Sequence, residues 1–170
     1  MSEQWVNLGD LGFTEYSVSD LGRVKRDATE RIVKATSNTT GYLQVGLYCK
    51  GVRKKIGLNR LVAHAFLLDP VEDHFNVLLH KDGNRINCSA SNLIWRPRWF
   101  AIKYHQQFEG RDEYQPVDIV REVNSGRMYA SVKDVVVEHG LLYIDLLNSM
   151  TAGTSPMFAD GRVFKYNSEL

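Results

Sequence analysis

Apolar and polar side chains alternate along the first 57 residues, which is the pattern of short, half-buried β-strands. Residues 5–24 predict short strands around a tight bend at 20–24. The clearest alternation runs over residues 39–48. Lys50-Gly51 predicts a hairpin turn after it, and residues 53–56 begin the return strand. We therefore expect a β-rich N-terminal region.

Helical spacing follows over residues 58–67, with Pro70 beyond its end. Apolar side chains at i, i+1, i+4 and i+5 share one face of this helix: Leu61, Val62, Ala65 and Phe66. Residues 76–80 and 93–95 then read as the arms of a hairpin around an irregular loop, 81–91. Pro97 suits the first turn of a helix that runs to about Phe108, so the order predicts a ββα unit.

A polar stretch at residues 111–115, followed by Pro116, is typical of a linker. Beyond it the pattern predicts a hairpin (117–121 and 128–129), two helices (132–139 and 142–150) and a closing strand (162–166). Ser131 is a suitable N-cap for the first helix, and Gly140 is a suitable stop. Two helices joined by a three-residue turn have the outline of a helix-turn-helix.

The predicted fold class is α+β. Its parts are a β-rich region over residues 1–57, a ββα core over 58–110, a linker over 111–116 and a helix-turn-helix-like module over 117–170. The composition agrees with a globular protein, since 44% of the 170 residues are hydrophobic and 24% are charged.

No apolar run approaches the roughly 18 residues of a membrane helix, and Ser2-Glu3-Gln4 after Met1 does not resemble a signal peptide. We therefore expect a cytoplasmic protein with no membrane partner. In that compartment Cys49 and Cys88 are expected to be free thiols. No paired Cys/His spacing favours zinc.

The net charge of +1 is unevenly distributed. Residues 1–60 contain ten Lys/Arg and six Asp/Glu, residues 61–110 contain five of each, and residues 111–170 contain six and nine. Because phosphates bind basic surfaces, nucleic-acid contact is expected in the N-terminal third. The candidate side chains there are Arg23, Lys25, Arg26, Lys34, Arg53, Lys54 and Lys55.

Motifs in the first two-thirds of the chain resemble those of phage-type HNH homing endonucleases. The matching residues are Trp5, Tyr16-Ser17-Val18-Ser19, Gly22-Arg23-Val24, Gly41-Tyr42 through Leu47, Arg60-Leu61-Val62-Ala63 with Phe66, His80-Lys81-Asp82-Gly83-Asn84, and Asn92-Leu93 with Trp95. The C-terminal hairpin and helices are similar to a DNA-binding repeat appended to such enzymes. The resemblance implies a protein of a phage or bacterial host cytoplasm that binds double-stranded DNA.

The resemblance also implies a site in which His80 acts as general base on water and one divalent metal, Mg²⁺ or Mn²⁺, stabilises the departing oxyanion. The family's two metal ligands fall on Leu79 and Ala101, and neither side chain has a donor atom. His105, one helical turn after Ala101, is the remaining candidate ligand. A set of turn and hairpin residues is expected to fix the loop: Gly83, Asn84, Asn87, Asn92 and Trp95.

The C-terminal module departs from a DNA-reading one. Its second helix contains no Lys or Arg, although Arg, Lys, Asn and Gln do most base-edge reading. It offers Leu142, Tyr143 and Ile144 instead, so we expect these residues to bind a protein partner.

Three functions remain open from the sequence. The favoured one is an HNH homing-endonuclease-like DNA-binding protein with a degenerate nuclease site and no cofactor, which acts on DNA or on a transcription or replication protein. The alternative is an active metal-dependent endonuclease that nicks or cleaves DNA with His80 as general base. The third is a virion or host-interaction protein with no nucleic-acid role.

Overall fold

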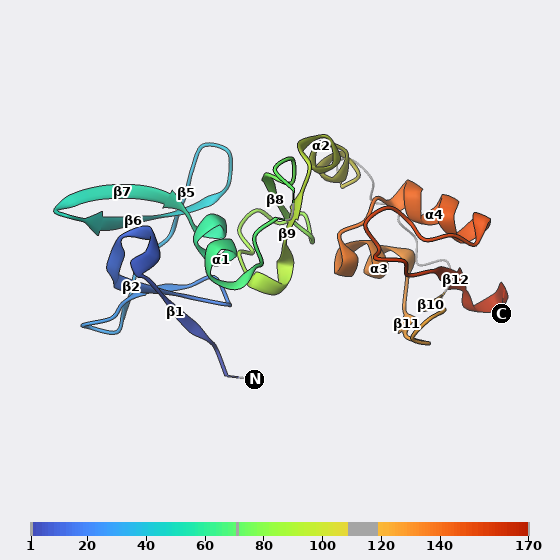
Figure 1. Cartoon of the computed structure of the whole chain (residues 1–170), viewed down its shortest axis with the longest axis horizontal. Coiled ribbons are helices and arrows are strands. Elements are labelled where there is room, and N and C mark those ends of the chain that lie inside the picture. The colour runs from blue at the N-terminus through green and yellow to red at the C-terminus, as the bar shows by residue number, and fades with distance from the viewer. Residues whose placement is uncertain (1, 71, 109–118, 170) are drawn as a thin grey trace. The chain divides into compact units, whose positions relative to one another are not determined.

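A computed structural model of the chain describes residues 2–70, 72–108 and 119–169 (Figure 1). The chain divides into two compact units. The N-terminal unit contains the residues up to His80 together with Asn84–Arg96, and the C-terminal unit contains Lys81–Gly83 and Pro97–Leu170. Within the described ranges, no helix is both long and apolar enough to cross a membrane. The predicted linker over residues 111–116 lies outside the described residues.

The N-terminal unit begins with an antiparallel sheet in the order β1-β2-β3-β4. Its strands are β1 (Trp5–Leu8), β2 (Phe13–Ser19), β3 (Val24–Arg26) and β4 (Arg31–Ile32), with a 3-10 turn, η1, at Gly9–Leu11. The predicted bend between β2 and β3 depends on Gly22, which has a φ of 77°. A Cβ atom at Gly22 would also lie 3.0 Å from the carbonyl carbon of Cys88, so both conformation and space require glycine.

A second sheet has the order β5-β6-β7, from β5 (Thr36–Ser37), β6 (Leu43–Cys49) and β7 (Val52–Gly57). The expectation of a strand beginning at residue 39 was wrong, because β6 begins at Leu43. Asn38 Oδ1 accepts hydrogen bonds from the backbone N–H groups of Thr40 and Tyr42 and folds these residues into a turn. The predicted Lys50-Gly51 turn is formed, with φ values of 50° and 78°.

One hydrophobic core joins these sheets to the helix α1 (Leu58–Phe66) and to the hairpin of β8 (Val77–His80) and β9 (Leu93–Arg96), which is preceded by the 3-10 turn η2 (Ala90–Asn92). The buried core residues are Leu8, Phe13, Tyr16, Val18, Val24, Val45, Leu47, Leu58, Leu61, Val62, Cys88 and Leu93. The predicted apolar face of α1 therefore packs inward, with Ala65 and Phe66 partly buried at its margin. The core fixes the hairpin against both sheets.

The C-terminal unit contains a small sheet in the order β11-β10-β12, flanked by helices. Its elements are α2 (Arg98–Gln106), β10 (Val120–Glu122), β11 (Met128–Tyr129), α3 (Val132–His139), α4 (Tyr143–Ala152), β12 (Phe164–Tyr166) and η3 (Asn167–Glu169). Pro97 is the N-cap of α2 rather than part of its first turn. Ser131 caps α3 by accepting from the N–H of Asp134, and Gly140 ends it in the left-handed conformation.

Candidate functional site at the end of strand β8

The candidate histidine is the last residue of β8. In the antiparallel register His80 pairs with Leu93, and Leu79 pairs with Ile94. Successive strand residues point to opposite faces, so Leu79 and His80 face opposite sides of the hairpin. Both side chains are fully buried, with exposed fractions of 0%.

The imidazole of His80 is packed against a thiol and an aromatic ring. Its Nε2 lies 4.0 Å from Sγ of Cys88, and its ring centroid lies 5.7 Å from that of Tyr42. Burial raises the pKa of the Cys88 thiol to about 11, although a backbone hydrogen bond from Asn59 lowers it. The thiol is therefore neutral at physiological pH and stabilises no positive charge on the imidazole.

The loop between β8 and β9 is held by its own asparagines. Asn84 accepts the N–H of Asn87 through its carbonyl oxygen and the N–H of Ile86 through Oδ1, while Asn92 Nδ2 donates to the carbonyl of Asn87. The N–H of Ala90 donates to the Asp20 carbonyl, which ties the loop to the β2–β3 bend. These bonds place the asparagines in turn geometry.

The other two structural residues of the predicted motif lie at the ends of this loop. Gly83 has a φ of 74°, and a Cβ atom there would lie 3.2 Å from Cδ2 of Phe108 within the C-terminal unit. Trp95 pairs with Leu78 across the hairpin of the N-terminal unit.

The expected metal-ligand positions do not fit a divalent ion. Leu79 and Ala101 have no donor atoms, and Ala101 is buried on α2 with 4% of its surface exposed. His105 is half-buried in the last turn of α2. Among the described residues, no group of three or more His, Cys, Asp or Glu side chains is placed to hold a metal ion.

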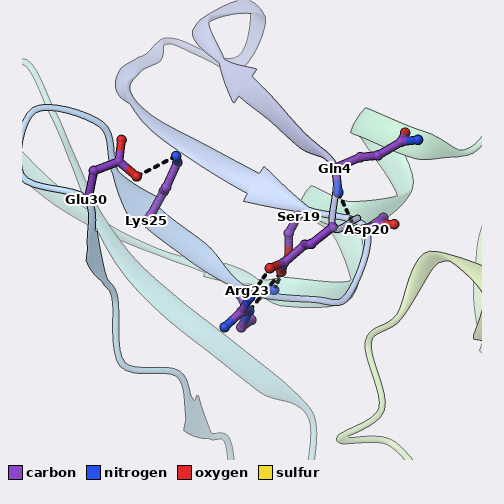
Figure 2. Close-up of polar contacts among 7 residues, drawn as sticks. Gln4, Ser19, Asp20, Arg23, Lys25 and Glu30 are labelled. Atoms are coloured by element: carbon purple, nitrogen blue, oxygen red, sulfur yellow. Dashed lines mark hydrogen bonds and ion pairs between the residues drawn. The ribbon is translucent and has the colours of Figure 1, made fainter. Parts of the chain in front are cut away.

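Three of the predicted phosphate-binding side chains form ion pairs within the first sheet. Lys25 Nζ lies 2.7 Å from Oε2 of Glu30 (Figure 2), and Arg26 pairs with Glu15 at 2.8 Å. Arg23 Nε donates to Glu3 at 2.8 Å. Lys25 and Arg23 also lie over the Trp5 ring, at 4.9 and 5.7 Å from its centroid. The carboxylates offset the positive charge of this sheet.

The β6–β7 hairpin separates the remaining basic residues by face. Arg53 pairs with Tyr48 and Lys55 pairs with Gly46, whereas Lys54 pairs with Leu47, whose side chain is buried in the core. Arg53 and Lys55 therefore share the face turned away from the core, and Lys54 lies on the other. Lys34 is exposed in the segment between β4 and β5.

The predicted partner-binding residues begin α4. Leu142 is buried, Tyr143 is half-buried, and Ile144 is 55% exposed. The first N–H group of α4, from Tyr143, donates to Oε1 of Gln107 at 2.9 Å. The sequence offered no signal for this cap, because Gln107 is distant along the chain.

A polar cluster in the C-terminal unit was also missed. His139 Nδ1 lies 2.8 Å from a guanidinium nitrogen of Arg162, and its Nε2 lies 2.9 Å from the Tyr129 hydroxyl. Burial lowers the pKa of His139, and the Arg162 charge lowers it further, against the opposing effect of Glu138. Chain folding alone brings these residues together.

Comparison with known proteins adds a motif and several relatives. Residues 3–48 match the NUMOD4 motif. Two uncharacterized HNH endonucleases of Acanthamoeba polyphaga mimivirus are similar: L245 is 35% identical over 134 residues, covering 71% of this chain and 39% of that protein, and L247 is 36% identical over 97 residues, covering 55% and 24%. The chain thus spans well under half the length of these relatives.

A phage protein is similar over most of both chains. The DNA endonuclease I-HmuI of Bacillus phage SP01 is 27% identical over 137 residues, covering 74% of this chain and 78% of that one. A solved structure described as DNA binding and cleavage by the HNH homing endonuclease I-HmuI matches with a TM-score of 0.54 at 24% identity, covering 96% of this chain and 98% of that one. The α+β fold and the resemblance expected from the motifs are confirmed.

Proposed function

We propose that this chain, which is related in sequence to HNH homing endonucleases, acts by binding double-stranded DNA and has a degenerate nuclease site. The observation that carries the proposal is the pair Leu79 and Ala101, two buried side chains without donor atoms at the positions where the family places metal ligands. Without ligands, metal affinity and metal-assisted phosphodiester cleavage are both lost.

The burial of His80 supports the same proposal. A general base must reach the water whose proton it takes, directly or through one other water. His80 has no exposed surface, and its ring contacts the neutral Cys88 thiol and the Tyr42 ring. We infer that His80 is a retained structural residue of the hairpin.

DNA contact is assigned to the β6–β7 hairpin. Arg53 and Lys55 lie on its outward face beside Tyr48, which is 55% exposed. A two-stranded ribbon of this kind fits a DNA groove while its cations contact phosphates. The ion pairs of Arg23, Lys25 and Arg26 make the first sheet the lesser contributor.

Retention of His80 at the end of β8 favours one second candidate, an active endonuclease. A supercoiled-plasmid assay with Mg²⁺ or Mn²⁺ separates the two functions. We expect no nicking by either the protein or its His80→Ala variant. Nicking by the protein that is abolished in His80→Ala would establish the enzyme instead. A mobility-shift series across salt concentrations tests binding, for which affinity must fall steeply with salt.

We also propose a protein partner for the C-terminal unit. Helix α4 carries no Lys or Arg and exposes Ile144 beside Tyr143. A transcription or replication protein is the class of partner that suits a DNA-bound chain. Cross-linking from Ile144→Cys in cell extract, with Thr151→Cys on the same helix as control, tests whether this end of α4 is covered.

A further inference from the structure

The N-terminal unit contains a groove of about 580 Å³. Neither His80 nor Cys88 lines it, but one wall is Tyr42, whose ring packs against the His80 imidazole. It is formed by the base of the β6–β7 hairpin, the first turn of α1 and the hairpin β8–β9. Its volume is in the range of ligand sites in proteins. We call it the α1 groove.

The charge of the α1 groove is wholly positive. Among the described residues that line it, Lys55 and Arg60 are the only charged ones, and none is a carboxylate. Both side chains are exposed, and neither forms an ion pair with another described residue. Three amides, Asn38, Asn59 and Asn76, supply further donors. This set of groups suits an anion with several acceptor oxygens.

The start of α1 adds donors of the same sign. Its N-cap is Gly57, which has no side chain with which to cap the helix, and its first turn contains no acidic residue. Gly57, Asn59 and Arg60 all line the groove. Asn59 Oδ1 accepts a hydrogen bond from the N–H of Arg60 at 2.9 Å. Because this amide is uncharged, the positive end of the helix still has no counter-charge.

The indole of Trp95 gives the groove an aromatic wall. Its Nε1 is buried and has no acceptor among the described residues. A buried donor without an acceptor is destabilising. Trp95, Arg60 and Asn76 also line an adjoining groove of about 480 Å³, which contains the carboxylate of Asp69 and the apolar Phe13. An anion is therefore favoured in the α1 groove over its neighbour.

We propose that the α1 groove binds a phosphate group, held by Lys55, Arg60 and the first turn of α1. Lys55 shares its face of the hairpin with Arg53, so the groove continues the proposed DNA-contact surface. The assignment of this phosphate to DNA rests on the proposed function. A free phosphate or nucleotide has the same chemistry.

Lys54 provides a matched control, because it has the same charge as its neighbour Lys55 but lies on the opposite face of β7. The test compares Lys55→Gln, Arg60→Gln and Lys54→Gln by mobility shift on a 20-base-pair duplex across a salt series. We expect the slope of log affinity against log salt to fall by about 0.9 in each groove variant and to stay unchanged in Lys54→Gln. The proposed phosphate site would be wrong if the unsubstituted protein and the three variants had equal slopes. It would also be wrong if the slope fell equally in Lys54→Gln.

Titration with inorganic phosphate, followed through the backbone amide resonances of Asn59 and Arg60, identifies the source of the phosphate. A saturable shift that is lost in Arg60→Gln supports a site open to free phosphate. No shift with phosphate, together with reduced slopes on the duplex, supports a site for polynucleotide alone.

If the protein does not bind the duplex at all, the proposed DNA-binding function is wrong. The amide titration alone then tests whether the α1 groove binds phosphate. A saturable phosphate shift lost in Arg60→Gln then supports it, and an unchanged spectrum overturns it. If the protein binds the duplex but the slopes of Lys55→Gln and Arg60→Gln are unaltered, the proposed phosphate site is wrong and the proposed DNA-binding function stands. Circular dichroism confirms that each variant is folded, which is expected because Lys54, Lys55 and Arg60 are exposed.

Discussion

The Sγ atom of Cys88 lies 4.0 Å from Nε2 of His80, inside the core that packs the β8–β9 hairpin. The imidazole of His80 has no exposed surface, and the thiol beside it is uncharged. A histidine in this setting contributes packing at a position where a nuclease needs access to water.

The raised pKa of Cys88 predicts low reactivity of its thiol. At pH 8 a thiol with a pKa of about 11 is ionised in about one molecule in a thousand, and the thiolate is the reactive form. We expect iodoacetamide to modify Cys88 in a Cys49→Ser variant only slowly until urea is added. Mass spectrometry measures the extent, and rapid stoichiometric labelling of the folded variant would contradict the burial of Cys88.

Replacement of His80 by alanine is expected to lower stability. The fully buried ring fills space between Cys88 and Tyr42, so its removal creates a cavity and costs about 2–4 kcal/mol. Urea unfolding measures the loss. His64→Ala, at an exposed position on α1, is the control and should change stability by less than about 0.5 kcal/mol. Equal stability of the two variants would show that the His80 ring is dispensable for packing.

Protonation of His139 is expected to destabilise the C-terminal unit. Arg162 donates to Nδ1, which can accept only in the neutral imidazole. The folded-state pKa lies below 6.5, so the unfolded chain binds the proton more readily. Stability is therefore complete above pH 6.5 and falls as the pH decreases toward the folded-state pKa.

The measurement is the urea midpoint of the C-terminal unit at pH 7.5 and pH 5.0. In His139→Gln, whose amide oxygen can accept from Arg162 at both pH values, the difference between the two midpoints should shrink. His74→Gln removes an exposed histidine of the N-terminal unit and serves as control. An unchanged pH dependence in His139→Gln would exclude His139 as its source.

The ion pairs of the first sheet predict a weak DNA contribution from its cations. Lys25 and Arg26 are paired with Glu30 and Glu15, so Lys25→Gln and Arg26→Gln should each alter DNA affinity by less than about twofold. Glu30→Gln should increase affinity, because it releases the Lys25 charge. Fluorescence anisotropy at fixed salt measures these effects. A tenfold loss of DNA affinity in Lys25→Gln would contradict this prediction and show that the first sheet contacts DNA.

Much of the fold was predictable because local patterns carry it. Alternation predicted β6 and β7 to within a few residues, helical spacing predicted α1, and the Ser131 cap with the Gly140 stop predicted the bounds of α3. For residues 5–24 the pattern predicted short strands but not their individual bounds. The start of β6 was not predicted, since it depends on which backbone groups Asn38 bonds. The pairing of β12 with β10 joins segments far apart in sequence and has no local signal.

The sequence by itself determined the family resemblance, the hairpin that presents His80 and the absence of donor atoms at Leu79 and Ala101, because side-chain identity and short-range spacing suffice for each. Only the tertiary structure decided which cations are neutralised, which of Lys54 and Lys55 faces outward, and that Arg60 and Lys55 line one groove. These properties depend on strand register and on contacts between distant segments. The burial of His80 against Cys88 was decided in the same way, by the packing of the loop onto the β2–β3 bend.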